Sequence, residues 1–324
     1  MHIFKFNSIL KPVLWGGDKI VELKQLPQHG DMPIGESWEL SAMPGHESVV
    51  AAGSDSGLTL TQLVQRYGAE LVGEDVYRRY GGRFPLLFKF IDARRDLSIQ
   101  VHPGDEMAMR CHGCPGKNEM WYILHADEGA VIRAGFSRPV TPEEYERRIA
   151  DGSILDVINA MPSRAGAAFF IPSGQIHSIG AGNLLVEIQE ACDITYRVYD
   201  YNRRDAQGNL RELHTRQARE ALCFSPTDSL VKEYSEIVPG VTRLYRCPMF
   251  EVWRVQVDGR LVLPLQERHS FAALMGLGGS MAITGEGVQP ATLEGGESAL
   301  VPAVASAITI DGCGELLVTT VPEQ

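Results

Sequence analysis

The sequence has no apolar run that approaches the roughly eighteen residues of a membrane-spanning helix. It also has no basic excess, because 41 Asp and Glu outnumber 30 Lys and Arg and give a net charge of −11 at pH 7. Nucleic acid and anionic membrane surfaces need a basic footprint on the protein, so we expect neither as a partner. A small anionic substrate is still allowed, since a few local Lys and Arg residues can outweigh the overall field.

Export and disulfide signals are missing as well. The N-terminal stretch MHIFKFNSILKPVLWGG lacks an apolar segment followed by a small-residue cleavage site, so no signal peptide is predicted. Six cysteines are too sparse for a disulfide scaffold, and we expect reduced thiols in a cytoplasmic protein. Cys111 and Cys114 form a single C-x-x-C. No second pair follows, so a flexible loop at the mouth of a site is favoured over a redox or second-metal role.

Length and composition favour a globular protein with a sizeable core. The chain has 324 residues, 44% of them apolar and 22% charged, which suits one large domain or two medium ones. A nucleotidyltransferase fusion is excluded by this length and by the lack of a Gly-rich nucleotide loop beside a basic segment.

The candidate metal ligands begin on a strand that stops at Pro103. The run LSIQVH at 97–102 alternates, so Gln100 and His102 are predicted to point to one face of it. Glu119 opens a second strand-like run after a loop. An amide, an imidazole and a carboxylate on neighbouring strands suit a borderline divalent ion such as zinc.

A third segment supplies the closing ligand. In GAAFFIPSGQIH at 166–177, a strand runs into a Pro/Gly turn and the chain re-enters a strand at His177. This spacing, with the Q-x-H pair and a downstream glutamate, resembles the two motifs of the cupin β-barrels, jelly rolls that hold a metal in the barrel mouth. A single histidine is more often a core residue whose hydrogen bonds are satisfied by its neighbours, but the joint spacing of these residues favours a metal site.

Helices are predicted around these strands. Residues 59–72 place apolar side chains at the 3-4 spacing of an amphipathic helix, with Thr59 as its N-cap. The string TPEE at 141–144 opens one or two helices that reach Asn159 and wall a pocket. Residues 210–222 also look helical.

Two strand-like stretches carry an embedded cation. In the apolar run 84–92, Lys89 either snorkels to an edge or points into a polar cavity. In the alternating stretch 193–204 the cation is Arg197, and a rim salt bridge with Asp193 or Asp200 is the alternative to a functional role.

The C-terminal part is rich in β signals from Arg243 onward. We place a boundary in the weakly periodic segment 226–239, which gives a metal-binding domain at 1–235 with helical insertions and a second domain at 236–324. The string GESALVP at 296–302 repeats the G-x5-P half of the motif before His177, with Ala307 where the histidine would stand. We interpret the second domain as a degenerate barrel that has lost its metal and stabilises the first.

Six strings together resemble a known family, the type I phosphomannose isomerases, also called mannose-6-phosphate isomerases. The likeness is strong over residues 1–220, weak beyond, and keeps the family's order. The strings are GESWELS (35–41), FPLLFKFIDA (84–93), LSIQVHP (97–103), KNEMWY (117–122), IPSGQIHSIGAG (171–182) and EIQEACDITYRVYDYNR (187–203). The length is similar to the short bacterial form of the family, so the resemblance implies a mainly β fold of two cupin-type jelly-roll barrels, with helical insertions in the first.

The resemblance implies a zinc-dependent aldose-ketose isomerase of carbohydrate metabolism, which interconverts mannose 6-phosphate and fructose 6-phosphate through a cis-enediol. It implies Arg197 as the active-site arginine, and it places Lys117 and Ser98 toward substrate. Two positions depart from the family pattern, with Gly116 where longer members can carry a histidine and Glu190 where a glutamine is more usual. One zinc per chain would be bound by Gln100, His102, Glu119 and His177.

The implied chemistry moves a proton between two carbons of the sugar phosphate. Zinc would polarise the two substrate oxygens as a Lewis acid. Lys117 is the first candidate for the base, because a nearby dication and partial burial favour its neutral form, and a metal-bound hydroxide is the alternative. Arg197 would face the enediolate or the phosphate. Ser98 and Lys89 are weaker candidates for binding the phosphate.

Other functions fit the same motifs less well. A non-catalytic, sugar-binding regulator could use this fold, but the presence of Lys117 and Arg197 beside all four ligands favours an enzyme. Another metal-dependent sugar isomerase is a further alternative. A cupin oxygenase that uses Fe(II) would prefer a histidine-richer ligand set.

Overall fold

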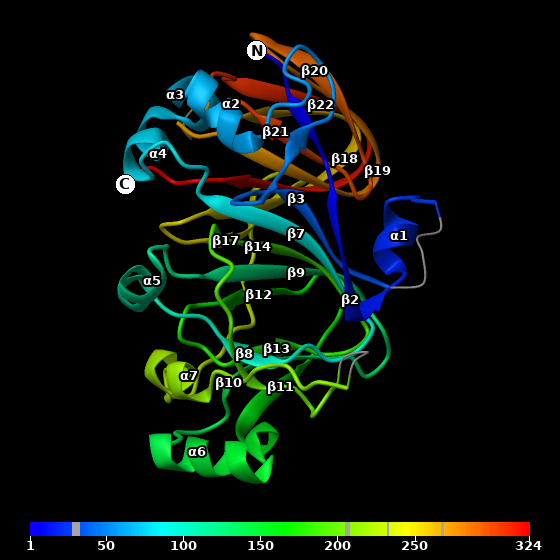
Figure 1. The fold of residues 1–324 in the computed structure, drawn as a ribbon. Coiled ribbons are helices and arrows are strands. Elements are labelled where there is room, and N and C mark those ends of the chain that lie inside the picture. Colours follow the sequence, from blue (N-terminus) through cyan, green and yellow to red (C-terminus); the bar gives the residue numbers. More distant parts are fainter. Residues whose placement is uncertain (28–32, 205–207, 232, 267–268) are drawn as a thin grey trace.

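The computed structural model describes residues 1–27, 33–204, 208–231, 233–266 and 269–324. The molecule is mainly β, as predicted, with most of its helices at the periphery (Figure 1). The C-terminal strands, orange to red, lie in the upper half of the view, and the strands of the predicted metal site lie in the lower half (Figure 1). No helix in the described ranges is long and apolar enough to cross a membrane.

Two antiparallel sheets form the lower half. Side chains from both sheets, among them Trp121, Ile132 and Ile179, meet in one apolar cluster, so the sheets pack face to face. The first sheet is ordered β12 (Ala168–Ile171), β9 (Glu119–Ala126), β14 (Asn183–Glu190), β7 (Leu86–Ala93), β3 (Ile34–Leu40) and β2 (Ile9–Gly17). The second is ordered β11 (Ile158–Pro162), β10 (Val131–Phe136), β13 (His177–Ile179), β8 (Ile99–Val101) and β15 (Tyr196–Tyr199).

The central strands β7 and β14 explain the near-continuous apolar strings of the sequence. Every residue of both strands is buried, and strands covered on both faces lose the usual apolar-polar alternation. Two charged residues interrupt these apolar strands, and the register pairs them, Lys89 of β7 with Glu187 of β14. Two buried charges of opposite sign are thereby placed side by side.

The upper half is built on one large sheet. It is ordered β16 (Ser235–Val238), β17 (Val241–Arg246), β18 (Glu251–Pro264), β22 (Ala307–Thr320), β19 (Ala272–Gly285), β21 (Ser298–Val301), β1 (Phe4–Asn7) and β6 (Val49–Val50), and β20 (Val288–Glu294) also pairs with β19. The short strands β4 (Ala42–Met43) and β5 (His46–Glu47) pair with each other. Because β1 pairs with β21, residues from both sides of the expected division at 235 and 236 share a sheet, and the division itself stays a prediction.

The two copies of the suspected repeat have the same order of elements. β12 ends before Pro172 and β13 starts at His177, while β21 ends before Pro302 and β22 starts at Ala307. In both copies a connection that begins with proline joins two strands that do not pair with each other. The common ancestry of the two segments stays a prediction.

The helices differ from the sequence prediction at their ends. The expected helix at 59–72 begins with Thr59 as its N-cap, as predicted, and the cap is a capping box. It breaks into two helices at Gly68, because the φ of 51° at this residue lies outside the range of a right-handed helix. The expected helices that reach Asn159 stop earlier, because β11 begins at Ile158. The helices are α1 (Lys19–Leu23), α2 (Leu60–Tyr67), α3 (Ala69–Val72), α4 (Glu74–Arg79), α5 (Asp105–His112), α6 (Pro142–Asp151), the 3-10 helix η1 (Ile154–Val157) and α7 (Thr215–Ala221).

The predicted helix at 210–222 is wrong in its first half. The backbone N–H of His214 donates to the carbonyl of Arg197 at 2.7 Å, so this part of the chain runs beside β15 before α7 begins. This pairing brings the side chains of Arg211 and His214 next to the predicted site.

Candidate metal centre and active site

The predicted ligands come together from both sheets of the lower half. On the five-stranded sheet, Gln100 of β8 lies between His177 of β13 and Arg197 of β15 in the strand register. His102 directly follows β8, and Glu119 is the first residue of β9 on the facing sheet. The period-two spacing in the sequence thus places Gln100 and His102 toward the same interior.

Three of these side chains converge closely enough to bind one ion. The Nε2 atoms of His102 and His177 are 3.1 Å apart. The carboxylate of Glu119 lies 3.2 Å from His102 Nε2 through Oε1, and 3.7 Å from His177 Nε2 through Oε2. All three residues are buried, and their ligand atoms lie within 4.8 Å of one another.

The hydrogen bonds around this cluster orient its ligand atoms toward one another. The Nδ1 atoms of His102 and His177 lie 2.8 Å from the carbonyls of Ile194 and Gln175, so each Nδ1 carries the hydrogen and each Nε2 is left as an acceptor. Glu119 Oε1 pairs with Lys117 Nζ at 2.9 Å, whereas Oε2 has no hydrogen-bond partner among the described residues. Facing lone pairs of two imidazoles and a carboxylate favour a cation between them, and two nitrogens and an oxygen fit a zinc-like ion.

The protonation states favour ligand behaviour. Burial, and then the neighbouring His102, lowers the pKa of His177 to about 3. Burial, and then Lys117, also lowers the pKa of His102. Burial alone would raise the pKa of Glu119, but Lys117 and the two histidines outweigh it and hold that pKa well below its usual range. At neutral pH the cluster therefore holds two neutral imidazoles and one carboxylate.

Gln100 is near the cluster but is not turned toward it as a ligand. Its amide nitrogen lies 3.3 Å from His177 Nε2, while its oxygen accepts a hydrogen bond from Ser98 Oγ at 3.3 Å. A cation would take the oxygen, so Gln100 would bind one only with its amide turned over. Its role as the fourth ligand stays a prediction.

A polar cavity of about 350 Å³ opens beside the cluster. Its lining combines the predicted site residues with charged residues that the sequence analysis did not single out. It is lined by Trp15, Glu36, Lys89, Ile91, Leu97, Ser98, Gln100, Lys117, Ile179, Glu187, Asp193, Thr195, Arg197, Arg211 and His214. The predicted residues Lys89, Ser98, Lys117 and Arg197 thus share one cavity.

Lys117 joins the cavity to the ligand cluster. Its side chain is buried, and its Nζ lies 2.9 Å from Glu119 Oε1. The backbone N–H of Lys117 donates to the carbonyl of Pro103 at 3.3 Å, which ties its loop to the end of β8. The Lys117 side chain is therefore fixed within reach of both the ligand cluster and the cavity.

Arg197 presents its guanidinium to the cavity rather than to a rim carboxylate. Nη1 donates to the carbonyl of Glu212 at 3.1 Å, and the buried Nε has no hydrogen-bond partner among the described residues. Asp200, one alternative partner considered above, instead accepts from Arg211 at 2.5 and 2.7 Å and pairs with Arg203. Asp193, the other alternative, forms no ion pair with Arg197 in the part of the chain that the structure describes.

Lys89 points into the cavity, which decides between the two alternatives left open by the sequence. Its Nζ lies 2.8 Å from Glu187 and 3.9 Å from Glu36. Burial alone would lower the pKa of Lys89, but these two carboxylates outweigh it and raise that pKa above its usual range. Glu187 also accepts from Trp121 Nε1 at 3.0 Å, and the Trp121 ring packs edge-on against His177.

Four charged or titratable cavity residues were not singled out from the sequence, namely Glu36, Glu187, Arg211 and His214. Glu187 could have been found as the only charge in the middle of a buried strand opposite Lys89. Arg211 and His214 were hidden by the mistaken helix at 210–222. The Arg197 backbone N–H donates to His214 Nδ1 at 3.2 Å, so the Nε2 of this histidine carries the hydrogen.

The two departures from the family pattern have local structural reasons. A Cβ at Gly116 would lie 2.8 Å from the backbone nitrogen of Asp105, so a larger residue has no room against the start of α5. Glu190 accepts hydrogen bonds from the backbone N–H and the side-chain amide of Asn118, at 3.1 and 2.6 Å. Glu190 thereby positions the residue that precedes Glu119.

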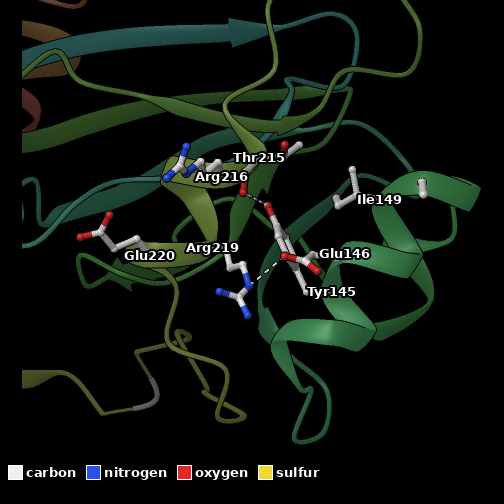
Figure 2. Close-up of a pocket in the computed structure, with 8 residues that line it drawn as sticks. Tyr145, Glu146, Ile149, Thr215, Arg216, Arg219 and Glu220 are labelled. Carbon is white, nitrogen blue, oxygen red and sulfur yellow. Dashed lines mark hydrogen bonds and ion pairs between the residues drawn. The ribbon is translucent and has the colours of Figure 1, made fainter.

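The helical insertion walls a different pocket. Figure 2 shows this groove of about 680 Å³ between α6 and α7, where Arg219 Nε lies 3.0 Å from Glu146 and Tyr145 donates to the carbonyl of Thr215 at 3.2 Å. The cavity beside the ligand cluster has no lining residue from α6. α7 lies between the two, since His214 lines the cavity and Thr215 lines the groove.

Comparisons with known proteins agree with this arrangement. Residues 3–131 match the family model described as phosphomannose isomerase type I, catalytic domain. The mannose-6-phosphate isomerase ManA of Bacillus subtilis is 33% identical over 318 residues, 97% of each chain. The mannose-6-phosphate isomerase of Streptococcus mutans is 33% identical over 316 residues, 96% of each chain.

Solved structures extend the likeness to the whole fold. The crystal structure of the Bacillus subtilis mannose 6-phosphate isomerase matches with a TM-score of 0.88 at 30% identity, covering 98% of this chain and 99% of that one. A variant of the phosphomannose isomerase from Salmonella typhimurium matches with a TM-score of 0.81 at 17% identity, covering 99% and 100%. The second match supports the fold alone.

Proposed function

Because the chain belongs to the type I phosphomannose isomerase family, we propose that this enzyme interconverts mannose 6-phosphate and fructose 6-phosphate through a cis-enediol. One zinc ion per chain would be held by Gln100, His102, Glu119 and His177. The observation that carries the proposal is the buried cluster of two unprotonated Nε2 atoms and a carboxylate, with their ligand atoms within 4.8 Å of one another, which lies at a cavity rich in cations. We also propose that this site belongs to a barrel formed by residues 1–235 and that residues 236–324 form a second barrel without metal.

The ligand cluster and Lys117 would perform the chemistry. A bound zinc ion would supply Lewis-acid stabilisation of the negative charge that develops on the substrate oxygens. Lys117 would take the proton from C2 of the aldose and return it to C1, while a second proton moves from the C2 oxygen to the C1 oxygen to give the ketose. Its place beside Glu119 and in the cavity wall supports this role, since a general base must lie within hydrogen-bond reach of the substrate carbon's proton.

The phosphate would be bound by the guanidinium groups of the cavity. Arg197 has an Nε–H without a partner among the described residues, and Arg211 lines the same wall but already donates two hydrogen bonds to Asp200, so Arg197 is the first candidate. Planar guanidinium groups are suited to phosphate because they donate two parallel hydrogen bonds to it. Lys89 is paired with Glu187, so it is the weaker phosphate candidate, and Ser98 is engaged with Gln100.

The test is a coupled assay for fructose 6-phosphate formation from mannose 6-phosphate. We expect activity in the purified protein, loss after chelation, and recovery after zinc is added. His177→Ala should lose both the activity and the bound metal. His125→Ala is the matched control, because His125 is exposed and pairs with Asp127 away from the cluster, and it should keep both. Activity that survives complete metal removal would refute the proposal.

A further inference from the structure

Two segments that carry cavity residues, Lys117 in one and Asp193 in the other, each contain a cysteine. Cys114 follows the last turn of α5 and is partly exposed, whereas Cys192 is fully buried in the turn between β14 and β15. Their Sγ atoms are 3.6 Å apart. The cysteine that faces Cys114 is thus not its C-x-x-C neighbour Cys111, which is exposed on α5.

We infer that Cys114 and Cys192 form an oxidisable dithiol site, whose oxidant is a peroxide and whose disulfide lowers the activity of the enzyme. A disulfide bond is about 2.05 Å long, so the sulfurs need to approach by roughly 1.5 Å. Such a shift is within the reach of two turns and needs no unfolding. Cys114 is the residue that meets the oxidant, because it is the more exposed thiol, while burial raises the pKa of the Cys192 thiol.

The oxidation is a two-step reaction. Cys114 Sγ attacks one oxygen of hydrogen peroxide, the O–O bond breaks, and a sulfenic acid and water form. Cys192 Sγ then attacks the sulfenic sulfur and the S–O bond breaks, and the departing hydroxide takes the proton of the thiol to give a second water. The two thiols lose two electrons and two protons, and the peroxide is reduced to two waters.

The two turns that would move also hold residues of the proposed active site in place. The carbonyl of Ile194, two residues after Cys192, accepts from His102 Nδ1 and so fixes the orientation of that imidazole. On the other side, Lys117 lies three residues after Cys114 in the same loop. Pulling the two sulfurs together therefore shifts His102 and Lys117 relative to each other.

The expected loss of activity follows from how precisely the catalytic side chains must be positioned. A displacement of about 1 Å in a catalytic constellation can cost on the order of a hundredfold in rate, and a shift shared between two turns is expected to cost about tenfold. This part of the inference rests on the proposed isomerase function. The formation of the disulfide does not depend on it.

The experiment treats the purified, metal-loaded protein with hydrogen peroxide and maps its disulfides by peptide mass spectrometry, with the isomerase assay in parallel. We expect a Cys114–Cys192 linkage, an activity about tenfold lower, and recovery of activity after reduction with dithiothreitol. Cys114→Ser should keep its full activity under the same treatment. Cys111→Ser is the matched control and should still form the linkage.

The outcomes separate the two parts of the inference. A linkage between Cys111 and Cys114, or free thiols at 114 and 192 after treatment, would overturn the dithiol site whether or not the protein is an isomerase. A complete Cys114–Cys192 linkage with unchanged activity would overturn the effect on catalysis. Cys192→Ala is the second variant, and protection of its activity, as for Cys114→Ser, would support both parts.

Discussion

Replacing Arg197 by alanine is the sharpest single change to the proposed phosphate end of the cavity. Within the described part of the chain, the guanidinium makes one hydrogen bond to protein, from Nη1 to the carbonyl of Glu212, and its Nε–H has no partner. Truncation therefore removes one protein hydrogen bond, worth about 1 kcal/mol of stability. Hydrogen bonds to a charged group contribute about 1.5–3 kcal/mol, so the loss in kcat/KM should be roughly 10- to 150-fold.

The assay is steady-state isomerisation of mannose 6-phosphate, with urea unfolding to establish that the variant is folded. Arg197→Lys should recover only part of the loss, because an ammonium keeps the charge but lacks the planar fork. Arg216→Ala is the matched control, since Arg216 lines the groove of Figure 2 and not the cavity, and it should retain its activity. A fall of less than about tenfold in Arg197→Ala, equivalent to 1.4 kcal/mol, would show that the role given to Arg197 is wrong.

Three further predictions test other parts of the site. Lys117→Ala should reduce kcat by about a hundredfold or more and change the basic limb of the pH-rate profile, and an unchanged rate and limb would remove Lys117 from the chemistry. Lys89→Met should destabilise the protein in urea unfolding by about 3–5 kcal/mol because it leaves Glu187 as an unpaired buried charge, and combining it with Glu187→Gln should recover part of that loss. Equal destabilisation by the single and double variants would contradict this coupling. Burial alone would raise the pKa of Asp200, but its hydrogen bonds from Arg211 and Arg203 outweigh it and lower that pKa. Asp200 therefore stabilises the fold above the unfolded pKa of about 3.9 and loses this contribution as pH falls through the lower folded value. Asp200→Asn should accordingly be less stable than the wild type near pH 7, with a difference that shrinks below about pH 4, and a difference independent of pH would refute the argument.

The sequence was sufficient for the ligand cluster because strand periodicity is a local property. Gln100 and His102 share a face whatever the tertiary structure, and the Pro/Gly turn before His177 fixes where its strand begins. The mainly β class was implied by the resemblance to the type I phosphomannose isomerases. What joined these segments into one site was the family resemblance, which supplied the long-range pairing that no local pattern contains.

The parts that the sequence analysis missed depend on contacts between distant segments. The segment at 210–222 has helical composition, but its first residues pair with β15 instead, and tertiary pairing overrode local propensity. The break at Gly68 depends on a positive φ that a local 3-4 pattern does not reveal. Cys111 and Cys114 were expected in a flexible loop, whereas Cys111 lies on α5 and Cys114 faces Cys192 across the fold.

The location of the metal tests the central claim most directly. Anomalous diffraction at the zinc edge, from crystals of the purified protein grown without added metal, would show where the ion is bound. We predict one peak per chain within about 2.0–2.2 Å of the Nε2 atoms of His102 and His177 and of a carboxylate oxygen of Glu119. A peak elsewhere, or none at this cluster in an active preparation, would contradict the account.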